Sequence, residues 1–322
     1  MQITTTKKNL QFRAEILAQI RAFFAVRNVL EVETPILSPS TNPAPHLNNF
    51  VITTHQPHLY LQTSPEFAMK RLLADDCGDI YQICKAFRAD ERGKLHSEEF
   101  TILEWYRVNF DHHKLMNEVD DLLQATLNTS KAERITYRDL FLQYLKLDPF
   151  SSTETIKKTA LLRGLDDNLT KDRDTWLQLL LTHFIEPHLG QKRPIFVYDF
   201  PATQAMLAKI SPIIASCPHP HETEECHNVT AWHCAERFEV YFKGVELANG
   251  FHELNDAREQ RQRFEHELEI RAQLGLPPIP LDEDFLSTLD NLPPCAGVAL
   301  GVDRLMMLAA KAHSLPEISV FS

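Results

Sequence analysis

The sequence predicts an α+β protein, in which antiparallel hairpins are combined with helices. Residues 79–106 alternate as two strands joined by a charged loop, 89–99. Residues 235–250 form a second alternating pair around Gly244, which allows a turn. Residues 111–190 instead carry apolar side chains mostly at helical spacing. We interpret this helical segment as an insertion packed on the core, and we find little in it that looks catalytic.

The composition is that of an ordinary globular protein and excludes several other classes. With 322 residues, 43% hydrophobic and 24% charged, the chain can form one or two domains. Its net charge of −11 argues against a protein that mainly grips nucleic acid, because phosphate contacts need a basic surface. Six cysteines without a CxxC pair indicate reduced thiols. No apolar run has the length of a signal peptide or a membrane span, so we expect a cytoplasmic protein.

The N-terminal third begins with a predicted core helix at about residues 10–27 and a short strand, 29–33, that Thr34-Pro35 ends. A further strand is predicted at 58–63. After it, Ser64 is a good helix N-cap and Pro65 suits the first helical position. Local helix chemistry alone can therefore explain Glu66 in the first turn.

The first hairpin carries the residues that most resemble a ligand site. Alternation places Gln82, Cys84, Ala86 and Arg88 on one face of its first strand. On the second strand, one face carries Phe100, Ile102, Glu104 and Tyr106. Arginine matches phosphate oxygens, an aromatic ring stacks on a base, and a buried carboxylate needs a cationic partner. These residue types favour a floor for a ligand with a phosphate, a flat ring and an ammonium group. The alternative is an amphipathic hairpin in which Arg88 and Glu104 pair on a wet face.

A Cys/His-rich stretch follows the next predicted strand, 194–200. Residues 217–234 contain three cysteines and four histidines, a mixture that could ligate zinc. Their spacing matches no zinc-finger pattern, and the proline-rich context favours a loop. The metal hypothesis therefore stays the weaker of the two interpretations.

The second hairpin could hold a metal ion. Phe238, Val240 and Phe242 form its apolar face, and the polar face includes Glu239. Glu246 on the returning strand could approach Glu239, and two close carboxylates favour a cation between them. Mg²⁺ suits such a site because it binds carboxylates together with substrate phosphates. Two solvated carboxylates on an open face are the alternative.

The C-terminal part combines a charged helix with a strand of small residues. Asn255 is a plausible cap for a helix at 255–274, whose charge run we interpret as a solvated face. In the strand after Cys295, Gly297, Ala299 and Gly301 share one face, which lets a flat ligand lie against the backbone. Arg304 follows at the start of the next helix, where anions are favoured.

Taken in order, these stretches resemble the three motifs of class II aminoacyl-tRNA synthetases of the lysyl branch. The matching stretches are LEVETPIL, LYLQTSPEF, FRADERGKLHSEEFTILEWY, ERFEVYFKGVELANGFHELNDA and GVALGVDRL. The first-motif helix starts within about a dozen residues of Met1, so we expect no anticodon-binding domain. The chain therefore resembles most the elongation factor P–lysine ligases, a truncated branch of the lysyl enzymes. The resemblance implies one catalytic domain over residues 1–322, with an antiparallel sheet flanked by helices.

The resemblance also implies an activity. Members of that family use ATP to form a (R)-β-lysyl (or lysyl) adenylate and transfer the acyl group to a lysine of elongation factor P. We expect ATP, Mg²⁺, the amino acid and elongation factor P as the molecules that this protein binds. We expect neither a membrane nor tRNA as a partner. A homodimer through the first motif, residues 12–35, is expected as well.

The resemblance assigns roles to individual residues. Arg88 and Arg304 would bind the ATP phosphates and act as the catalytic residues. The remaining ATP-binding residues would be Asp90, His96, Phe100, Glu239, Glu246 and Gly301, with Mg²⁺ on Glu239 and Glu246. The amino-acid pocket would consist of Glu66, Glu104, Tyr106, Asn249, Glu253 and Ala299. Three carboxylates suit a substrate with two amino groups.

Some positions depart from the synthetase pattern. Asp90 is one methylene shorter than the usual Glu, Ser97-Glu98 replace Asn-Pro, and Ala299 replaces the middle glycine of the third motif. The methyl group of Ala299 would reshape the pocket, and it fits the ligase pattern. Three other functions remain open on the sequence: a minimal tRNA-charging synthetase, a non-catalytic lysine/ATP sensor, and a small amide ligase of the asparagine synthetase kind.

Overall fold

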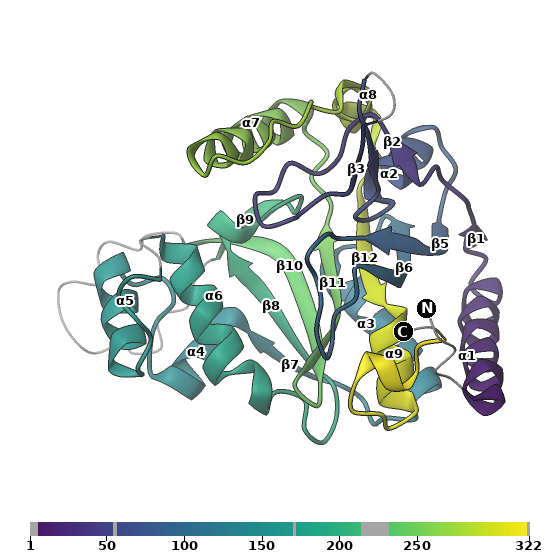
Figure 1. The fold of residues 1–322 in the computed structure, drawn as a ribbon, viewed down its shortest axis with the longest axis horizontal. Coiled ribbons are helices and arrows are strands. Elements are labelled where there is room, and N and C mark those ends of the chain that lie inside the picture. The colour runs from purple at the N-terminus through teal and green to yellow at the C-terminus, as the bar shows by residue number, and fades with distance from the viewer. Residues whose placement is uncertain (1–5, 54–56, 170–171, 214–231, 321–322) are drawn as a thin grey trace.

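The fold is built on one large mixed sheet (Figure 1). The structure is a computed structural model that describes residues 6–53, 57–169, 172–213 and 232–320. Strand order in the sheet is β1-β5-β6-β12-β11-β10-β8-β7, and β9 pairs with β10 beside it. The β1–β5 and β7–β8 pairs are parallel, and the other pairs of this sheet are antiparallel. The nine strands are β1 (Leu30–Glu31), β5 (Ile80–Phe87), β6 (Glu99–Val108), β7 (Glu133–Thr136), β8 (Ile195–Pro201), β9 (Ile210–Ile213), β10 (Trp232–Phe242), β11 (Val245–His252) and β12 (Cys295–Gly301).

A small second sheet lies beside the first. Its order is β2-β4-β3, and its strands are β2 (Leu37–Ser38), β3 (Val51–Ile52) and β4 (Leu59–Leu61). The strand predicted at 58–63 is therefore β4, and it belongs to this small sheet rather than to the main one.

The α-helices are α1 (Lys7–Ala25), α2 (Glu66–Ala74), α3 (His112–Leu127), α4 (Tyr137–Leu145), α5 (Thr153–Leu162), α6 (Arg173–Phe184), α7 (Ala257–Gln273), α8 (Glu283–Thr288) and α9 (Val302–Ala309). Short 3₁₀ helices are η1 (Glu186–His188), η2 (Ala202–Gln204), η4 (Leu289–Asn291) and η5 (Leu315–Glu317). None of the helices in the described part of the chain combines the length and the apolar character needed to cross a bilayer.

One face of the sheet, here called the reverse face, packs on α1, α3 and α9 in a shared hydrophobic core. The sheet contributes alternate residues such as Leu103 and Trp105 of β6 and Val298 and Leu300 of β12. Burying these apolar side chains is the main stabilising contribution, at about 25 cal/mol per Å² of apolar surface. The intervening residues of the same strands must point to the opposite face.

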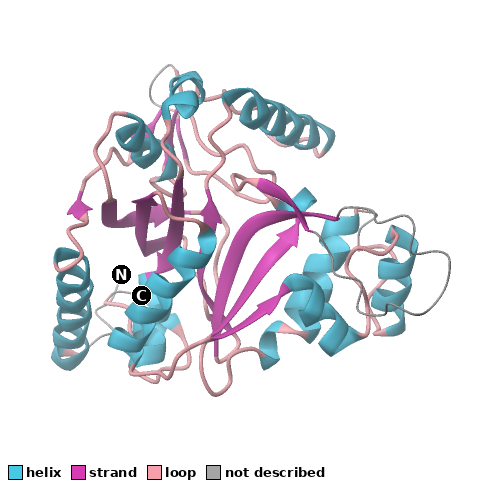
Figure 2. Cartoon of the chain, turned by 180° about the vertical axis from the view of Figure 1, so that it is seen from behind, coloured by secondary structure: helices cyan, strands magenta, loops and turns pink. Residues whose placement is uncertain are grey.

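Two groups of helices flank that opposite face, here called the site face. At one end, α2, α7 and α8 pack around Tyr106 in a separate hydrophobic core. At the other end, α4–α6 pack against Val197 of β8 and Tyr241 of β10. In both ribbon views α4–α6 lie at the end of the molecule away from α1 (Figure 1, Figure 2). The middle of the site face lies between these two groups.

The predicted elements are largely confirmed, with three differences. The helix over 255–274 is α7, but Asp256 rather than Asn255 caps it, since the Asp256 side chain accepts a hydrogen bond from the Glu259 amide. Glu66 begins α2 with Pro65 at the cap position, although Ser64 Oγ still accepts from the Glu66 amide at 3.1 Å. The segment 111–190 is mostly helical, yet its first helix, α3, is part of the main reverse-face core. Its character as an insertion stays a prediction.

The β10–β11 hairpin has the turn and the irregularity that place its acidic residues. Lys243 and Gly244 both have positive φ, as a two-residue type I′ turn requires. Val240 pairs with Ala248 and Tyr241 with Glu246, so β11 carries one extra residue, Leu247. Leu247 and Ala248 both pack in the reverse-face core. This β-bulge turns Glu246 back to the site face, the same face as Glu239.

Candidate functional site

A single row of paired residues crosses the middle of the site face. Glu104 of β6 pairs with Ala299 of β12, Ala299 with Asn249 of β11, and Asn249 with Glu239 of β10. Residues paired directly across neighbouring strands point to the same face of a sheet. Four of the predicted site residues therefore lie side by side. Glu104 and Glu239 are buried at the two ends of the row, and Ala299 and Asn249 are partly exposed between them.

The Glu104 end of the row is a buried carboxylate pocket. Glu104 is 2% exposed and accepts hydrogen bonds from Ser64 Oγ at 2.6 Å and from the Tyr106 hydroxyl at 2.7 Å. Burial raises the pKa of Glu104 to about 7, and the negative charge of Glu66 adds to the shift. Near neutral pH this carboxyl group is therefore poised to release its proton when a cation approaches.

The other two pocket carboxylates share a buried lysine that the sequence analysis did not single out. Lys70 Nζ lies 2.6 Å from Glu253 Oε2 and 2.7 Å from Glu66 Oε1, and the Lys70 side chain is 1% exposed. Burial opposes its charge, but Glu253 and Glu66 together raise the pKa of Lys70 above its ordinary value. Burial raises the pKa of Glu253 to about 8, although Lys70 opposes this shift. We interpret Lys70 as the cation that holds both carboxylates in place.

Glu104 is consequently the pocket carboxylate left for a ligand. Among the described residues, Lys70 forms ion pairs with Glu66 and Glu253. Glu104 forms no ion pair there and only accepts hydrogen bonds from the Ser64 and Tyr106 hydroxyls. Glu66 is still 13% exposed, so it too can be reached. An ammonium group that entered the pocket would find Glu104 at its base and Glu66 at its side.

The opposite end of the site is more open and carries arginines. Arg304, in the first turn of α9, donates to the Glu246 carbonyl oxygen at 2.9 Å and lies 3.4 Å from Glu246 Oε2. Its Nη2 lies 2.8 Å from His96 Nε2. Burial lowers the pKa of His96, and the adjacent Arg304 lowers it further. A neutral His96 imidazole can therefore accept a hydrogen bond from the Arg304 guanidinium.

Arg88 lies beside the predicted adenine platform. Its guanidinium carbon is 5.2 Å from the centre of the Phe100 ring, and its Nη1 is 3.7 Å from Glu91. Arg88 Nε is buried and has no hydrogen-bond partner among the described residues. Such an orphaned donor is costly unless a ligand satisfies it. Asp90 is exposed and accepts a hydrogen bond from Asn48 Nδ2 at 3.3 Å.

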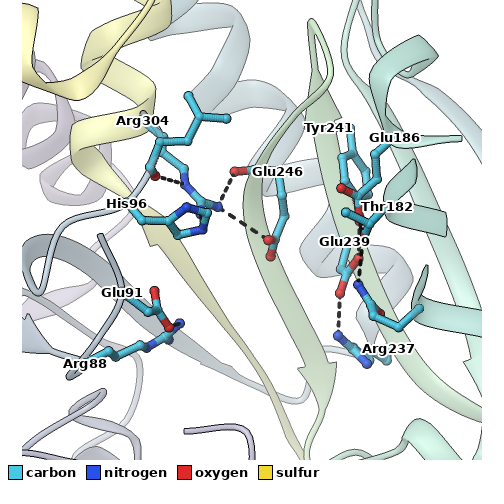
Figure 3. Close-up of polar contacts among 12 residues, drawn as sticks. Arg88, Glu91, His96, Thr182, Glu186, Arg237, Glu239, Tyr241, Glu246 and Arg304 are labelled. Carbon is cyan, nitrogen blue, oxygen red and sulfur yellow. Dashed lines mark hydrogen bonds and ion pairs between the residues drawn. The ribbon is translucent and has the colours of Figure 1, made fainter. Parts of the chain in front are cut away.

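Glu246 of β11 lies between Arg304 of α9 and Glu239 of the adjacent strand β10 (Figure 3). Glu239 is 8% exposed and accepts hydrogen bonds from Arg237 and the Tyr241 hydroxyl. Burial raises the pKa of Glu239; Arg237 opposes the shift and Glu246 adds to it. A third carboxylate, Glu186 of η1, contacts Tyr241, and burial together with the charge of Glu239 raises the pKa of Glu186 to about 7.

These carboxylates fit a divalent cation by their chemistry. The charge of Glu246 adds to the cost of ionising Glu239, and a cation between the two carboxylates would remove this cost. Oxygen ligands of this kind suit Mg²⁺. The residues present therefore agree with the predicted metal pair, and Glu186 lies near enough to affect it electrostatically.

Two glycines of β12, Gly297 and Gly301, are in different surroundings. A Cβ at Gly297 would lie 2.3 Å from the Tyr106 ring and 2.4 Å from Glu253 Oε1, so packing of the pocket requires glycine there. A Cβ at Gly301 would meet only the Arg304 side chain, at 3.6 Å, which is an ordinary contact. Protein packing does not explain Gly301. Open backbone beside Arg304 is what a ligand lying against the strand would need.

Comparison with known proteins identifies the family. The family model described as tRNA synthetases class II (D, K and N) matches residues 1–322, the whole chain. The chain belongs to the class II tRNA synthetases. It is also similar to curated proteins of three Salmonella strains, each named elongation factor P–(R)-β-lysine ligase. Identity is 51% for the proteins of Salmonella typhi and Salmonella gallinarum and 50% for that of Salmonella paratyphi B, over 98% of this chain and 94% of each relative.

Several residues of this class II site were missed by sequence reasoning. Lys70 had a signal, because it lies four residues after Glu66 on one helix, a spacing that favours an ion pair. Ser64 was considered only as a helix cap, yet it also donates to Glu104. Glu186 comes from the helical segment in which we expected little chemistry, and no local pattern marks it. The Cys/His-rich stretch lies outside the described residues from 217 to 231, so its metal hypothesis stays untested.

Proposed function

We propose that this protein uses ATP to activate (R)-β-lysine, or lysine, and transfers the aminoacyl group to a lysine side chain of elongation factor P. The observation that carries the proposal is the row from Glu104 to Glu239, which joins an ammonium-binding pocket to an arginine- and carboxylate-lined end. The relatives' name supplies the acceptor and the amino acid.

In the first step, the substrate carboxylate attacks the α-phosphorus of ATP and diphosphate leaves. Arg88 and Arg304 bind the phosphates and stabilise the growing charge, with His96 assisting Arg304. Phe100 stacks on adenine, Asp90 lies near its edge, and Gly301 gives the nucleotide access to the backbone. Glu239 and Glu246 would hold Mg²⁺, which supplies positive charge to the phosphates.

The amino acid is held at the other end of the row. Glu104 and Glu66 bind its ammonium groups, Asn249 and Tyr106 add polar contacts, and Ala299 forms the floor between them. Glu253 forms part of the pocket wall and holds Lys70 in place through their ion pair. In the second step, a neutral lysine amine of elongation factor P attacks the adenylate carbonyl and AMP leaves. Positioning of the reactants supplies most of the rate, so no enzyme nucleophile is required.

We also propose a homodimer and a single catalytic domain in which β7 and α4–α6 form the insertion. Exposed apolar side chains near the first motif support the dimer, including Val26 at 77% and Leu30 at 56% exposure. In a dimer these side chains would be removed from water against the partner surface. The two substrates, ATP and a translation factor, place the proposed activity in the cytoplasm.

The test is ATP–diphosphate exchange with (R)-β-lysine and with α-lysine, followed by mass spectrometry of elongation factor P. Exchange that depends on one of these amino acids, with a matching mass increase on elongation factor P, is the expected result. Absence of exchange with both amino acids would overturn the proposal. Efficient acylation of tRNA in place of elongation factor P would show a tRNA-charging enzyme instead.

A further inference from the structure

Two histidines and a glutamate meet on the reverse face of the sheet, behind the site described above. His112 begins α3, Glu236 lies on β10 and His252 lies on β11. One ligand atom from each, an imidazole nitrogen or a carboxylate oxygen, lies within 4.8 Å of the other two. Arg237 and Phe251 pair across β10 and β11, and their side chains face the site. Glu236 precedes Arg237 and His252 follows Phe251, so both point to the opposite face. The cluster is therefore separated from the substrate pocket by the sheet itself.

The unusual feature is the buried imidazole nitrogen of His112. The side chain is 6% exposed, and its Nε2 lies 3.3 Å from Asp199 Oδ1. Because a carboxylate can only accept, Nε2–H donates to Asp199, and a neutral ring then leaves a lone pair on Nδ1. That Nδ1 has no hydrogen-bond partner among the described residues, and it faces Glu236 Oε2 at 3.9 Å. A buried acceptor that faces a partly exposed carboxylate needs a cation or a proton between the two.

The surroundings have the arrangement of a metal centre. A carboxylate that accepts from the far nitrogen of a ligating histidine is the usual support that fixes the ring. Asp199 has this position relative to His112. On the other side, the imidazole of His252 contacts the same Glu236 carboxylate through Nδ1. The Glu236 Oε2 atom therefore faces both imidazoles.

We propose that His112 Nδ1, Glu236 and His252 Nδ1 bind a divalent transition-metal ion, with zinc as the best match. Two imidazoles and a carboxylate are ligands that zinc accepts, with a water molecule in the fourth position. Ligand atoms around tetrahedral zinc are about 3.4 Å apart. His112 Nδ1 would move towards Glu236 from 3.9 Å, whereas Glu236 and His252 would separate slightly and His252 Nδ1 would give up its proton to the solvent as the ion binds. The ion would join α3 to β10 and β11. It would also hold the end of β11 just before Glu253.

Charge balance is compatible with a divalent ion at the cluster. Asp199 and Glu236 together carry two negative charges in a partly buried place, and one divalent ion neutralises both. Without the ion, both histidines would have to be protonated to give the same balance. Hard cations such as Ca²⁺ prefer oxygen ligands and should not replace zinc here.

The experiment measures zinc in protein without a histidine tag, by elemental analysis and by titration with zinc alone. Wild-type protein should bind one equivalent at the cluster, with thermal unfolding shifted upwards by zinc but not by calcium. Cobalt(II) bound there should show visible d–d absorption. His252→Gln and Glu236→Gln should remove this equivalent, and Asp199→Asn should weaken it about 10–100-fold. Asp199 has a φ of 59°, which Asn tolerates, so this variant should fold.

Two control variants locate the bound ion. His113→Gln alters the next histidine of α3, which is not among the three proposed ligands, and should keep the zinc. Cys226→Ser alters the Cys/His-rich stretch and should keep it as well. Zinc that persists in His252→Gln but disappears in Cys226→Ser would overturn the proposal, as would wild-type protein that binds no zinc. Folding of each variant is checked by circular dichroism and by diphosphate exchange, and Asp199→Asn remains decisive if the ligand variants unfold.

Discussion

The two ends of the site differ in how their charges are held. At the amine end, Lys70 is fully buried between Glu66 and Glu253, and Glu104 is fixed by two hydrogen bonds. At the phosphate end, Arg88 is about one third exposed and its nearest carboxylate oxygen is 3.7 Å away. The first end is preorganised by the protein, whereas the second depends on a ligand to complete its contacts. Substitutions at the two ends should therefore fail in different ways.

The largest loss of activity is expected at the phosphate end with little loss of stability. Arg304→Ala removes a donor aimed at developing negative charge, which typically costs about 10²–10³-fold in kcat. Because Arg304 is partly exposed, the protein should unfold at nearly the wild-type temperature. Diphosphate exchange measures the first effect and calorimetry the second. Arg92→Ala is the control, since Arg92 is 78% exposed and should leave both unchanged.

Lys70→Met should show the opposite pattern, with a large loss of stability. Removing one partner of a buried ion pair leaves an uncompensated charge and costs about 3–5 kcal/mol. Chemical denaturation measures the free energy of unfolding. Lys85→Met is the matched control, because Lys85 forms an exposed pair with Glu99 that contributes about 1 kcal/mol or less. Equal effects of the two substitutions would contradict the role assigned to Lys70.

The pH dependence of the amine end can be tested separately. The pKa of Glu104 is about 7 in the folded protein, above the ordinary value of 4.5, so the folded state holds the proton more tightly. Its contribution to stability is complete below about pH 4.5 and is lost as the pH rises through 7. Thermal unfolding of ligand-free protein between pH 5 and 8 should show this decline, and Glu104→Gln should reduce it. Lysine binding should conversely strengthen towards pH 7, with a proton released on binding in calorimetry.

The difference between the two ends also explains how much could be predicted from the sequence. Alternation along β6 placed Phe100, Glu104 and Tyr106 on one face because strand periodicity is local. The contact between Lys70 and Glu253 joins a helix to the end of a distant strand, so no local pattern could give it. The bulge at Leu247 likewise depends on how β10 and β11 pair. Charged residues could be predicted, but not which of them neutralise one another.

The smallest expected effect concerns the residue between the two ends. Ala299 pairs with Glu104 on one side and Asn249 on the other, so in the proposed site its methyl group would lie under the amino acid. Ala299→Gly removes that methyl group, which is worth about 1–3 kcal/mol of discrimination. We expect the ratio of kcat/KM for α-lysine over (R)-β-lysine to rise about 10-fold, because the added space suits an amino group one carbon closer to the carboxylate.

The matched control for Ala299→Gly is Ala296→Gly on the same strand. Ala296 is fully buried in the reverse-face core, so removing its methyl group should lower stability without changing the ratio. If both variants leave the ratio unchanged, the floor of the pocket does not select the amino acid. Selection would then fall to the carboxylates at the Glu104 end, whose spacing fixes where the two ammonium groups can lie. In that case Glu66→Gln, rather than Ala299→Gly, should alter the preference between the two amino acids. Of the two carboxylates that Lys70 contacts, Glu66 is the more exposed, at 13% against 1% for Glu253.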